Sequence, residues 1–254
     1  MPLSQWIIPD RIGALIIGDE ILLGKRQDRH FKRLLEEVVA RGLRLVWVRY
    51  VGDDGNALTA EFTQTLAVDH PVMCFGGIGA TPDDRTRTAL AAAAGVPLTR
   101  HPTAAATIED LFGAAAYPIR IRMAEFPVGS RCIPNPINGI AGFSFRNHHC
   151  LPGFPEMAHP MLSRVLDELY PVDRPDKRWM ERSVVVRHVG EGDLTPLLEK
   201  MEQMHPEVTI FSLPKLGPER EVEIGVRGCP TAMLAAFAEM QCQLQAQGII
   251  PPVG

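Results

Sequence analysis

The sequence has no long hydrophobic run, no basic leader and no excess of basic residues. No apolar stretch approaches the roughly 18–20 residues that a membrane-spanning helix needs. Residues 1–20 lack a positively charged region before an apolar stretch, so no signal peptide is predicted. Thirty acidic against 26 basic residues give a formal charge of −4, so neither a nucleic-acid nor a membrane partner is expected.

The five cysteines are odd in number and scattered, and none forms a CxxC pair. This usage favours reduced thiols in a cytoplasmic protein over a disulfide framework or a structural zinc site. Three common site motifs are also missing: the GK[ST] ending of a Walker A loop, the GxGxxG fingerprint and the GxSxG elbow. What the chain has in quantity is proline, whose 22 residues are nearly twice the usual share of about 5%. Many connections should therefore have fixed shapes.

The first 95 residues alternate predicted strands and helices. Strands are expected at 12–17, 43–51 and 71–75, and helices at 28–41, at 56–68 and in the Ala-rich segment that ends at Gly95. This order predicts an α/β fold, a three-layer α/β/α arrangement with a mostly parallel sheet. Ligands of such sheets bind beyond the carboxyl ends of the strands. The turns at 18–24, 52–55 and 76–86 should therefore share one rim.

The second half of the chain divides at a polar, proline-flanked linker at 171–176. Before it, short strand-like pieces lie within 131–151, and a helix is predicted over 155–170, with Pro160 expected to kink or shift it. After it, a β-α-β-β-α order predicts a small α+β domain of ferredoxin-like type. We therefore expect two domains, 1–171 and 177–254, the second of unknown role.

The loop 76–86 is the most informative segment. Gly76, Gly77 and Gly79 allow a ligand to approach closely and leave backbone N–H groups free to face an anion, and the following helix adds its N-terminal dipole. We therefore predict a phosphate site here that includes Thr81 and Thr86. The alternative is that the glycines merely turn the chain and Asp83 and Asp84 merely cap the helix.

Carboxylates next to an anion-binding loop predict a divalent cation, because they repel phosphate unless a cation lies between. Mg²⁺ is typically held by one or two carboxylates and substrate phosphate oxygens. Asp53, Asp83 and Asp84 are the predicted metal ligands, with Asp19 or Glu20 on the first rim turn, next to Gly18. A surface cluster of acids without function is the alternative.

Two proline-stiffened segments complete the candidate site. Asn135 lies between two prolines that fix its backbone direction, so its amide is expected to face a ligand; the alternative is a rigid turn. Pro152 and Gly153 repeat the pattern in the segment 151–157. Glu156 falls in the first turn of the next helix, where the dipole alone favours a carboxylate.

His148 and His149 suggest a metal site at first sight. Neighbouring residues of a strand point to opposite faces, so the two imidazoles are not expected to bind one ion. We assign them structural or surface roles.

Taken together, the motifs resemble a known family. GDEILLG at 18–24, VGDD at 51–54, GGIGATPDDRT at 76–86, PNPINGIAGF at 134–143 and LPGFPEM at 151–157 are similar to the MoaB/Mog molybdopterin-binding domain. The closest subgroup is the N-terminal domain of the CinA (competence/damage-inducible protein A) family. The chain departs from it at Ala80, where relatives often have proline, and at 28–30, where they often have DTN.

The resemblance implies an α/β/α fold with a pterin- or nucleotide-phosphate site around 76–84. In the molybdopterin adenylyltransferase branch two aspartates serve catalysis, and Asp53 and Asp84 match them. The CinA branch resembles a metal-dependent pyrophosphatase acting on ADP-ribose, and a related domain is fused to FAD synthetase. Relatives form dimers or trimers, which implies a homo-oligomer.

Three functions follow as hypotheses. The first is a metal-dependent hydrolase of a nucleotide diphosphate such as ADP-ribose. The second is a protein that binds or adenylylates molybdopterin. The third is a non-catalytic regulatory protein that keeps the fold. CinA's second domain should be longer than the segment after the linker, so its deamidase activity is not expected here.

Overall fold

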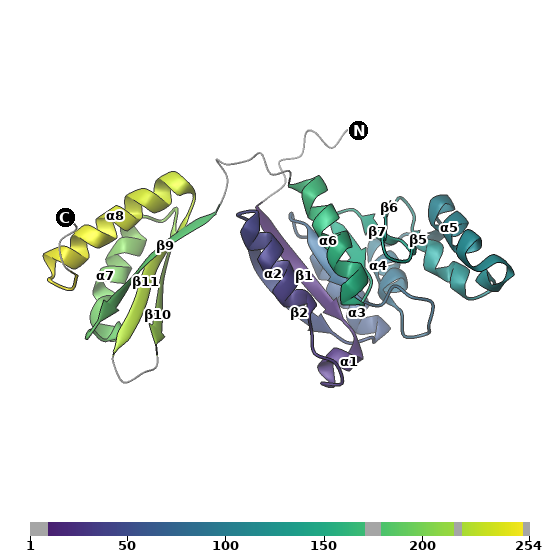
Figure 1. Ribbon diagram of the computed structural model, residues 1–254, viewed down its shortest axis with the longest axis horizontal. Helices are drawn as coiled ribbons and strands as arrows, with labels where there is room; N and C mark the ends of the chain where they lie inside the picture. The colour runs from purple at the N-terminus through teal and green to yellow at the C-terminus, as the bar shows by residue number, and fades with distance from the viewer. Residues whose placement is uncertain (1–9, 171–178, 216–219, 251–254) are drawn as a thin grey trace. The chain divides into compact units, whose positions relative to one another are not determined.

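Figure 1 shows the computed structural model of the chain, which describes residues 10–170, 179–215 and 220–250. The chain divides into two compact units, Met1–Val172 and Asp173–Gly254. The division falls within the predicted linker 171–176, which lies outside the described residues. Each unit has a hydrophobic core of its own.

The larger unit is built on a six-stranded sheet in the order β2-β1-β3-β8-β7-β6. Its parallel strands are β1 (Arg11–Ile17), β2 (Arg44–Val51), β3 (Val72–Phe75) and β8 (His148–Leu151). Strand β7 (Gly142–Phe145) runs antiparallel to β8 and to β6 (Arg131–Ile133). The prediction of a mostly parallel sheet is confirmed.

Helices cover both faces of this sheet and make three layers. On one face lie α2 (His30–Ala40) and α6 (Pro155–Leu169), side by side in Figure 1. The other face carries α3 (Gly55–Thr65) and α4 (Thr86–Ala94), and α5 (Pro102–Phe112) joins the same hydrophobic core. Strands β1 and β3 are almost wholly buried because both faces are covered, which is why their sequences are continuous apolar runs.

The helix ends follow the predicted chemistry with small shifts. Helix α2 begins at His30, and the Asp28 carboxylate accepts hydrogen bonds from the backbone N–H of His30 (2.7 Å) and of Phe31 (3.2 Å). Asp28 thus caps the helix from a position two residues before its first residue, His30. Gly95 ends α4 with a left-handed φ of 67°. Pro160 lies inside α6 without ending it.

Several short elements were not predicted. They are α1 (Asp19–Leu22), the paired strands β4 (Leu98–Arg100) and β5 (Glu125–Pro127), and two 3-10 helices, η2 (Gly113–Ala116) and η3 (Arg120–Ala124). Each is too short to show a periodic pattern of apolar residues.

The second unit is a three-stranded antiparallel sheet with two helices. It comprises β9 (Met180–Arg187), α7 (Glu191–Met204), β10 (Thr209–Lys215), β11 (Glu221–Gly228) and α8 (Pro230–Ala246), with strand order β10-β11-β9. Its core joins both helices to the sheet. Cross-strand ion pairs such as Arg187–Glu221 (2.8 Å) join β9 to β11. The predicted α+β order is confirmed.

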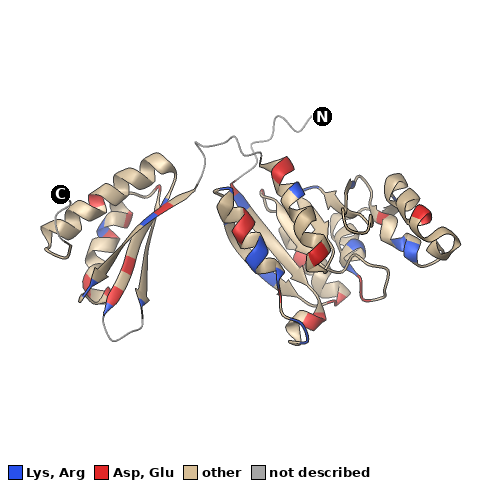
Figure 2. Cartoon of the chain, in the orientation of Figure 1, with Lys and Arg blue, Asp and Glu red and all other residues tan. Residues whose placement is uncertain are grey.

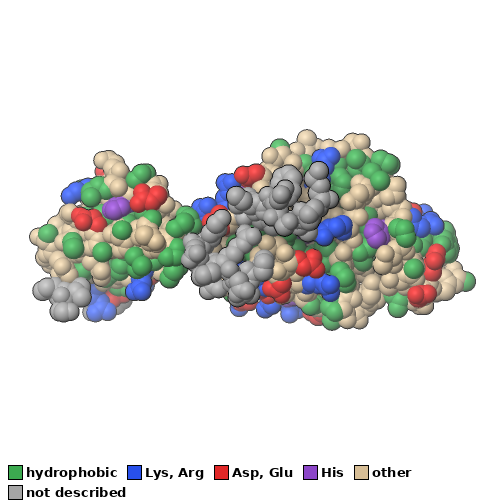
Figure 3. All heavy atoms as spheres, turned by 90° about the horizontal axis from the view of Figure 1, so that it is seen from above, with side chains coloured by type: hydrophobic (Ala, Val, Ile, Leu, Met, Phe, Trp, Pro, Cys, Tyr) green, Lys and Arg blue, Asp and Glu red, His purple; other side chains and the backbone are tan. Residues whose placement is uncertain are grey.

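Charges of both signs are mixed over the surface. Figure 2 shows acidic and basic residues interspersed in both units, and Figure 3 shows the same mixture, with apolar side chains between, on the face in view. Within the described ranges, no helix combines the length and the apolar character that crossing a membrane requires.

Candidate functional site

Four parallel strands end at one rim of the larger sheet, and three of them, β1, β2 and β3, were expected there. Gly18, Gly52, Gly76 and Pro152 follow the last residues of β1, β2, β3 and β8. A cavity of about 740 Å³ opens at this rim, within the size range of small-molecule sites. Most predicted site residues line it: Gly18, Glu20, Asp53, Gly76, Gly77, Gly79, Thr81, Asp83, Asp84, Asn135, Pro152 and Gly153.

The Gly-rich loop presents a row of unpaired backbone donors. Gly76 and Gly77 adopt φ values of 102° and 67°, and the Gly76 N–H bonds the Leu151 carbonyl at 3.0 Å. Over the described residues, the N–H groups of Gly77, Ile78, Gly79 and Ala80 have no hydrogen-bond partner within the chain. Consecutive free amides of this kind form an anion-binding concavity, and α4 begins directly behind it.

The loop is held from beneath by α4. The Thr86 hydroxyl donates to the Gly76 carbonyl at 2.8 Å, and the Thr86 N–H donates to the Gly77 carbonyl at 3.0 Å. Thr86 is fully buried and does not line the cavity, so its role is to position the loop rather than to contact a ligand.

Arg87 is a supporting residue that the sequence analysis missed. Its guanidinium donates to the carbonyls of Gly79 and Arg122, and burial lowers its pKa although Asp84 and Glu125 act in the opposite direction. The available signal was the second arginine of DDRTRT, which falls on the inner face of α4.

The acids of the rim are partly connected. The Asp19 N–H donates to Asp53 Oδ2 at 2.9 Å, and the Asp53 N–H donates to Asp19 Oδ1 at 3.2 Å, so the ends of β1 and β2 are joined. Burial, and then the charges of Asp19, Glu20 and Asp83, raise the pKa of Asp53. Asp19 itself does not line the cavity.

The predicted three-carboxylate metal site is not assembled. Asp84 turns back on its own loop, where it accepts hydrogen bonds from the N–H and the hydroxyl of Thr81. Among the described residues, no group of three or more His, Cys, Asp or Glu side chains could hold a metal ion. Asp53 and Asp83 still line the cavity, and an ion held by one or two carboxylates would need further oxygens from a bound ligand.

Asn135 and Glu156 serve the structure first. The Asn135 amide donates to Asn138 Oδ1 (2.7 Å) and to the Ile140 carbonyl (3.1 Å), and its own oxygen accepts from the Ile137 N–H. Both polar atoms of the Asn135 side chain thus bond within the turn, which fits the alternative of a rigid turn. Glu156 lies outside the cavity lining and pairs with Arg29 at 3.0 Å.

The histidines of β8 are structural, as predicted. His148 contacts the Thr65 hydroxyl at 2.8 Å, and His149 contacts the Ser144 hydroxyl at 2.9 Å. Burial lowers the pKa of His148 to about 3 and that of His149 to about 4. Both imidazoles are therefore neutral at pH 7.

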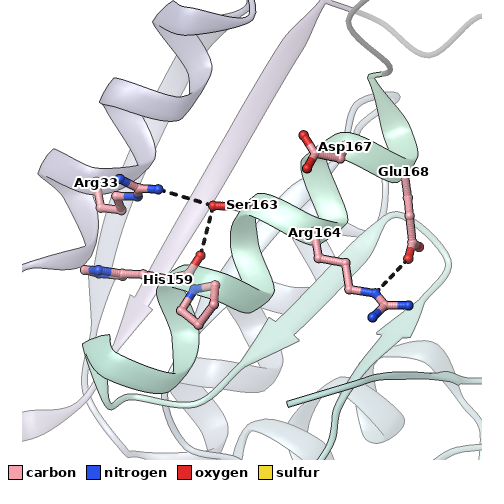
Figure 4. Close-up of a pocket in the computed structure, with 7 residues that line it drawn as sticks. Arg33, His159, Ser163, Arg164, Asp167 and Glu168 are labelled. Atoms are coloured by element: carbon pink, nitrogen blue, oxygen red, sulfur yellow. Dashed lines mark hydrogen bonds and ion pairs between the residues drawn. The ribbon is translucent and has the colours of Figure 1, made fainter. Parts of the chain in front are cut away.

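A second hollow, of about 770 Å³, lies between α2 and α6. Figure 4 shows its lining: Arg33 donates to Ser163, and Arg164 pairs with Glu168. Behind it, Glu37 binds Arg33, Arg41 and Ser163. These charges satisfy one another, so we interpret the hollow as the surface of a network that joins the two helices.

The Glu37 network should make stability depend on pH. Burial opposes ionisation of Glu37, but the hydrogen bonds from Ser163 and Arg41 outweigh it and lower the carboxyl pKa below its usual 4.5. The network's contribution to stability is present above pH 4.5 and is lost as the pH falls through the lowered pKa.

Replacing Glu37 should destabilise the fold. Glu37→Gln should lower the free energy of unfolding by about 1–2 kcal/mol at pH 7, less than for a fully buried pair because Arg33 is 41% exposed. Urea unfolding at several pH values measures this. Glu36→Gln, on the exposed side of α2, is the control, and an equal cost in both variants would contradict the assignment.

The comparisons with known proteins agree with this fold. Residues 13–171 match the family model described as a probable molybdopterin binding domain. A protein from Pyrobaculum arsenaticum is 26% identical over 255 residues, covering 98% of this chain and 91% of the relative. A CinA-like protein from Citrifermentans bemidjiense is 32% identical over 197 residues, covering 74% of this chain but only 47% of the relative.

Among solved structures, CinA from Thermoplasma acidophilum, a protein of unknown function, superposes with a TM-score of 0.59 at 26% identity. The match covers 64% of this chain and 98% of that one. With the strand order, the rim cavity and the Gly-rich loop, these similarities identify the larger unit. The chain belongs to the family of probable molybdopterin-binding domains and is related to the CinA-like proteins.

Proposed function

We propose that the rim cavity binds a nucleotide diphosphate and that the protein hydrolyses it with the help of a divalent metal ion. The observation that carries the proposal is the row of free amides at 77–80 in one cavity with the Asp53 carboxylate. The amides would bind one phosphate and stabilise charge that develops on it in the transition state. Donors preorganised in this way need no reorientation during the reaction.

The chain's carboxylates have a separate task. Burial and the nearby charges of Asp19, Glu20 and Asp83 raise the pKa of Asp53. A bound cation would lower that pKa again, because it favours the ionised carboxylate. A divalent ion there would supply charge neutralisation and an activated water. In the reaction, water oxygen bonds to one phosphorus, the P–O–P bridge breaks, and the bridging oxygen leaves with the other phosphate. With ADP-ribose the products are AMP and ribose 5-phosphate.

A substrate screen tests this function. ADP-ribose and FAD are incubated with the full chain and Mg²⁺, Mn²⁺ or Co²⁺, and AMP release is followed by chromatography. We expect turnover with at least one ion and none after chelation with EDTA. Turnover that survives EDTA would remove the metal from the proposal, and no turnover under any condition would remove the hydrolase.

The family assignment favours a second candidate, the binding or adenylylation of molybdopterin. The same free amides would hold the pterin phosphate, and adenylylation would transfer AMP from ATP to it and release pyrophosphate. Calorimetry with molybdopterin and with ADP-ribose separates the two candidates. Failure to bind any pterin would exclude this one.

Cytoplasmic location and self-association as a dimer or trimer stay predictions. Light scattering on the purified chain measures the second directly.

A further inference from the structure

The aromatic side chain of Phe154 lies at the rim and is not part of the hydrophobic core. Phe154 lines the cavity and is 55% exposed. It occupies the N-cap position of α6, between Gly153 and Pro155, and makes no capping hydrogen bond through its side chain. An exposed ring on a cavity wall is available to a ligand.

Arg26 lies over this ring from another loop. Its guanidinium carbon is 5.9 Å from the Phe154 ring centroid, and Arg26 lines the same cavity. In the described part of the chain, the Arg26 side chain has no carboxylate partner, unlike Arg29 and Arg33 on the following turns. The Arg26 guanidinium and the Phe154 ring therefore lie together at the cavity, and neither pairs with a carboxylate of the described residues.

Both groups are held close to the phosphate loop. His30 Nε2 lies 3.2 Å from the Gly153 carbonyl, and the Arg29–Glu156 pair joins the two loops. An added Cβ on Gly153 would lie 3.4 Å from Gly76 Cα, an ordinary van der Waals contact, so Gly153 lies beside the start of the Gly-rich loop. Phe154 therefore lies one residue from a neighbour of that loop.

Three apolar side chains, Met123, Ile140 and Met157, also line the cavity, together with the side-chain amides of Asn135 and Asn138. Both side-chain amides bond within the chain: Asn138 Nδ2 donates to Met157 Sδ at 3.4 Å, and Asn135 Nδ2 donates to Asn138 Oδ1 at 2.7 Å. The cavity therefore has a polar part, at the amides and Asp53, and an aromatic and apolar part. A ligand that fills both must join a phosphate to a flat, largely apolar ring.

We propose that Phe154 and Arg26 form a ring subsite, which binds the planar heteroaromatic ring of the ligand while the amides of 77–80 bind its phosphate. The subsite rests on the proposed function and adds the ring to it. The ring stacks on Phe154, and Arg26 swings outward to cover it, because two stacked layers need about 7 Å between the flanking groups. Adenine and pterin share this chemistry.

Calorimetry with three probes tests the subsite. ADP-ribose and neopterin monophosphate carry a ring and a phosphate, whereas ribose 5-phosphate carries the phosphate alone. The full chain is compared with Phe154→Leu and with Phe154→Tyr, which keeps the aromatic face. We expect Phe154→Leu to weaken binding of at least one ring-bearing probe by roughly 5- to 150-fold, the range of base–aromatic stacking, and to leave ribose 5-phosphate unchanged.

The outcomes test the ring subsite separately from the proposed binding of a nucleotide diphosphate. Phe154→Tyr should bind within about twofold of the unaltered chain, and the ring-bearing probe that Phe154→Leu weakens tells adenine from pterin. Equal weakening of all three probes by Phe154→Leu, or equal affinity of the unaltered chain for probes with and without a ring, would overturn the subsite alone. Binding of none of the probes would overturn both the subsite and the proposed function.

Discussion

Replacing Asp53 by Asn is expected to lower metal-dependent turnover by about 100- to 10,000-fold, the range for loss of a positioned acid–base or charge-stabilising group. Asn keeps the shape and can still accept the hydrogen bond from the Asp19 N–H. What it removes is the negative charge that would hold a cation at the cavity wall. Steady-state kinetics on ADP-ribose at saturating Mn²⁺ measure the effect.

The same substitution should not weaken the fold. The folded pKa of Asp53 is raised by burial and by neighbouring acids, so the ionised carboxylate costs stability above that pKa. Asp53→Asn should therefore raise the urea midpoint at pH 7, and the gain should vanish near pH 3, where both folded and unfolded carboxyls are protonated. A loss of turnover together with a loss of stability would indicate damage to the rim instead.

Asp54 is the matched control for Asp53. It is the neighbouring aspartate of the same motif, but its carboxylate caps α3 by accepting from the N–H groups of Asn56 (3.0 Å) and Ala57 (2.9 Å). Asn is an equally good N-cap, so Asp54→Asn should change neither stability nor turnover by much. If Asp54→Asn abolished turnover as well, the role assigned to Asp53 would not be specific.

Gly76→Ala is expected to destabilise the larger unit by about 2–5 kcal/mol. A left-handed residue with a side chain costs about 1–2 kcal/mol, and forcing an atom into a filled site costs about 1–3 kcal/mol. Gly76 has a φ of 102°, and an added Cβ would lie 2.2 Å from the Ile17 carbonyl oxygen, which is backbone and cannot turn away. The urea midpoint followed by circular dichroism measures the loss, and phosphate binding should fall with it.

Gly24 separates the two costs. Its φ is 68°, but an added Cβ would meet nothing within 4 Å. Gly24→Ala should therefore show only the left-handed strain, about 1–2 kcal/mol. Equal losses in the two variants would mean that contact with Ile17 contributes nothing and that the loop can shift to admit a methyl group.

The sequence predicted the strands and the rim because those features depend on local pattern. Buried parallel strands such as β1 must be apolar on both faces, and the order of strands and helices fixes which ends meet. Gly-rich turns after such strands then fall on one rim, whatever the order of strands in the sheet. This is why residues as distant as Glu20 and Asp83 could be placed on one rim from sequence.

What the sequence left open was the direction of individual side chains. Asp84 and Asn135 were expected to face a ligand, yet both bond within their own turns, since a nearby backbone N–H is always within reach of a short polar side chain. Arg87 and Thr86 support the loop from α4 through contacts that exist only once the helix packs. Phe154 falls in a proline-stiffened turn, and its position beside Arg26 could not be predicted because the two residues lie far apart in the sequence.

The exchanged hydrogen bonds between Asp19 and Asp53 have a further consequence. Strand β2 is the outermost strand at one edge of the sheet, so β1 is its only strand neighbour among the described residues. Its carboxyl end is fastened by these bonds and by the Gly18 N–H to the Val51 carbonyl (3.0 Å). The wall that carries Asp53 therefore lies at one edge of the sheet. A ligand that binds only this folded rim would stabilise the attachment of β2 to β1 by mass action, so ligand binding and the stability of the sheet edge should be linked.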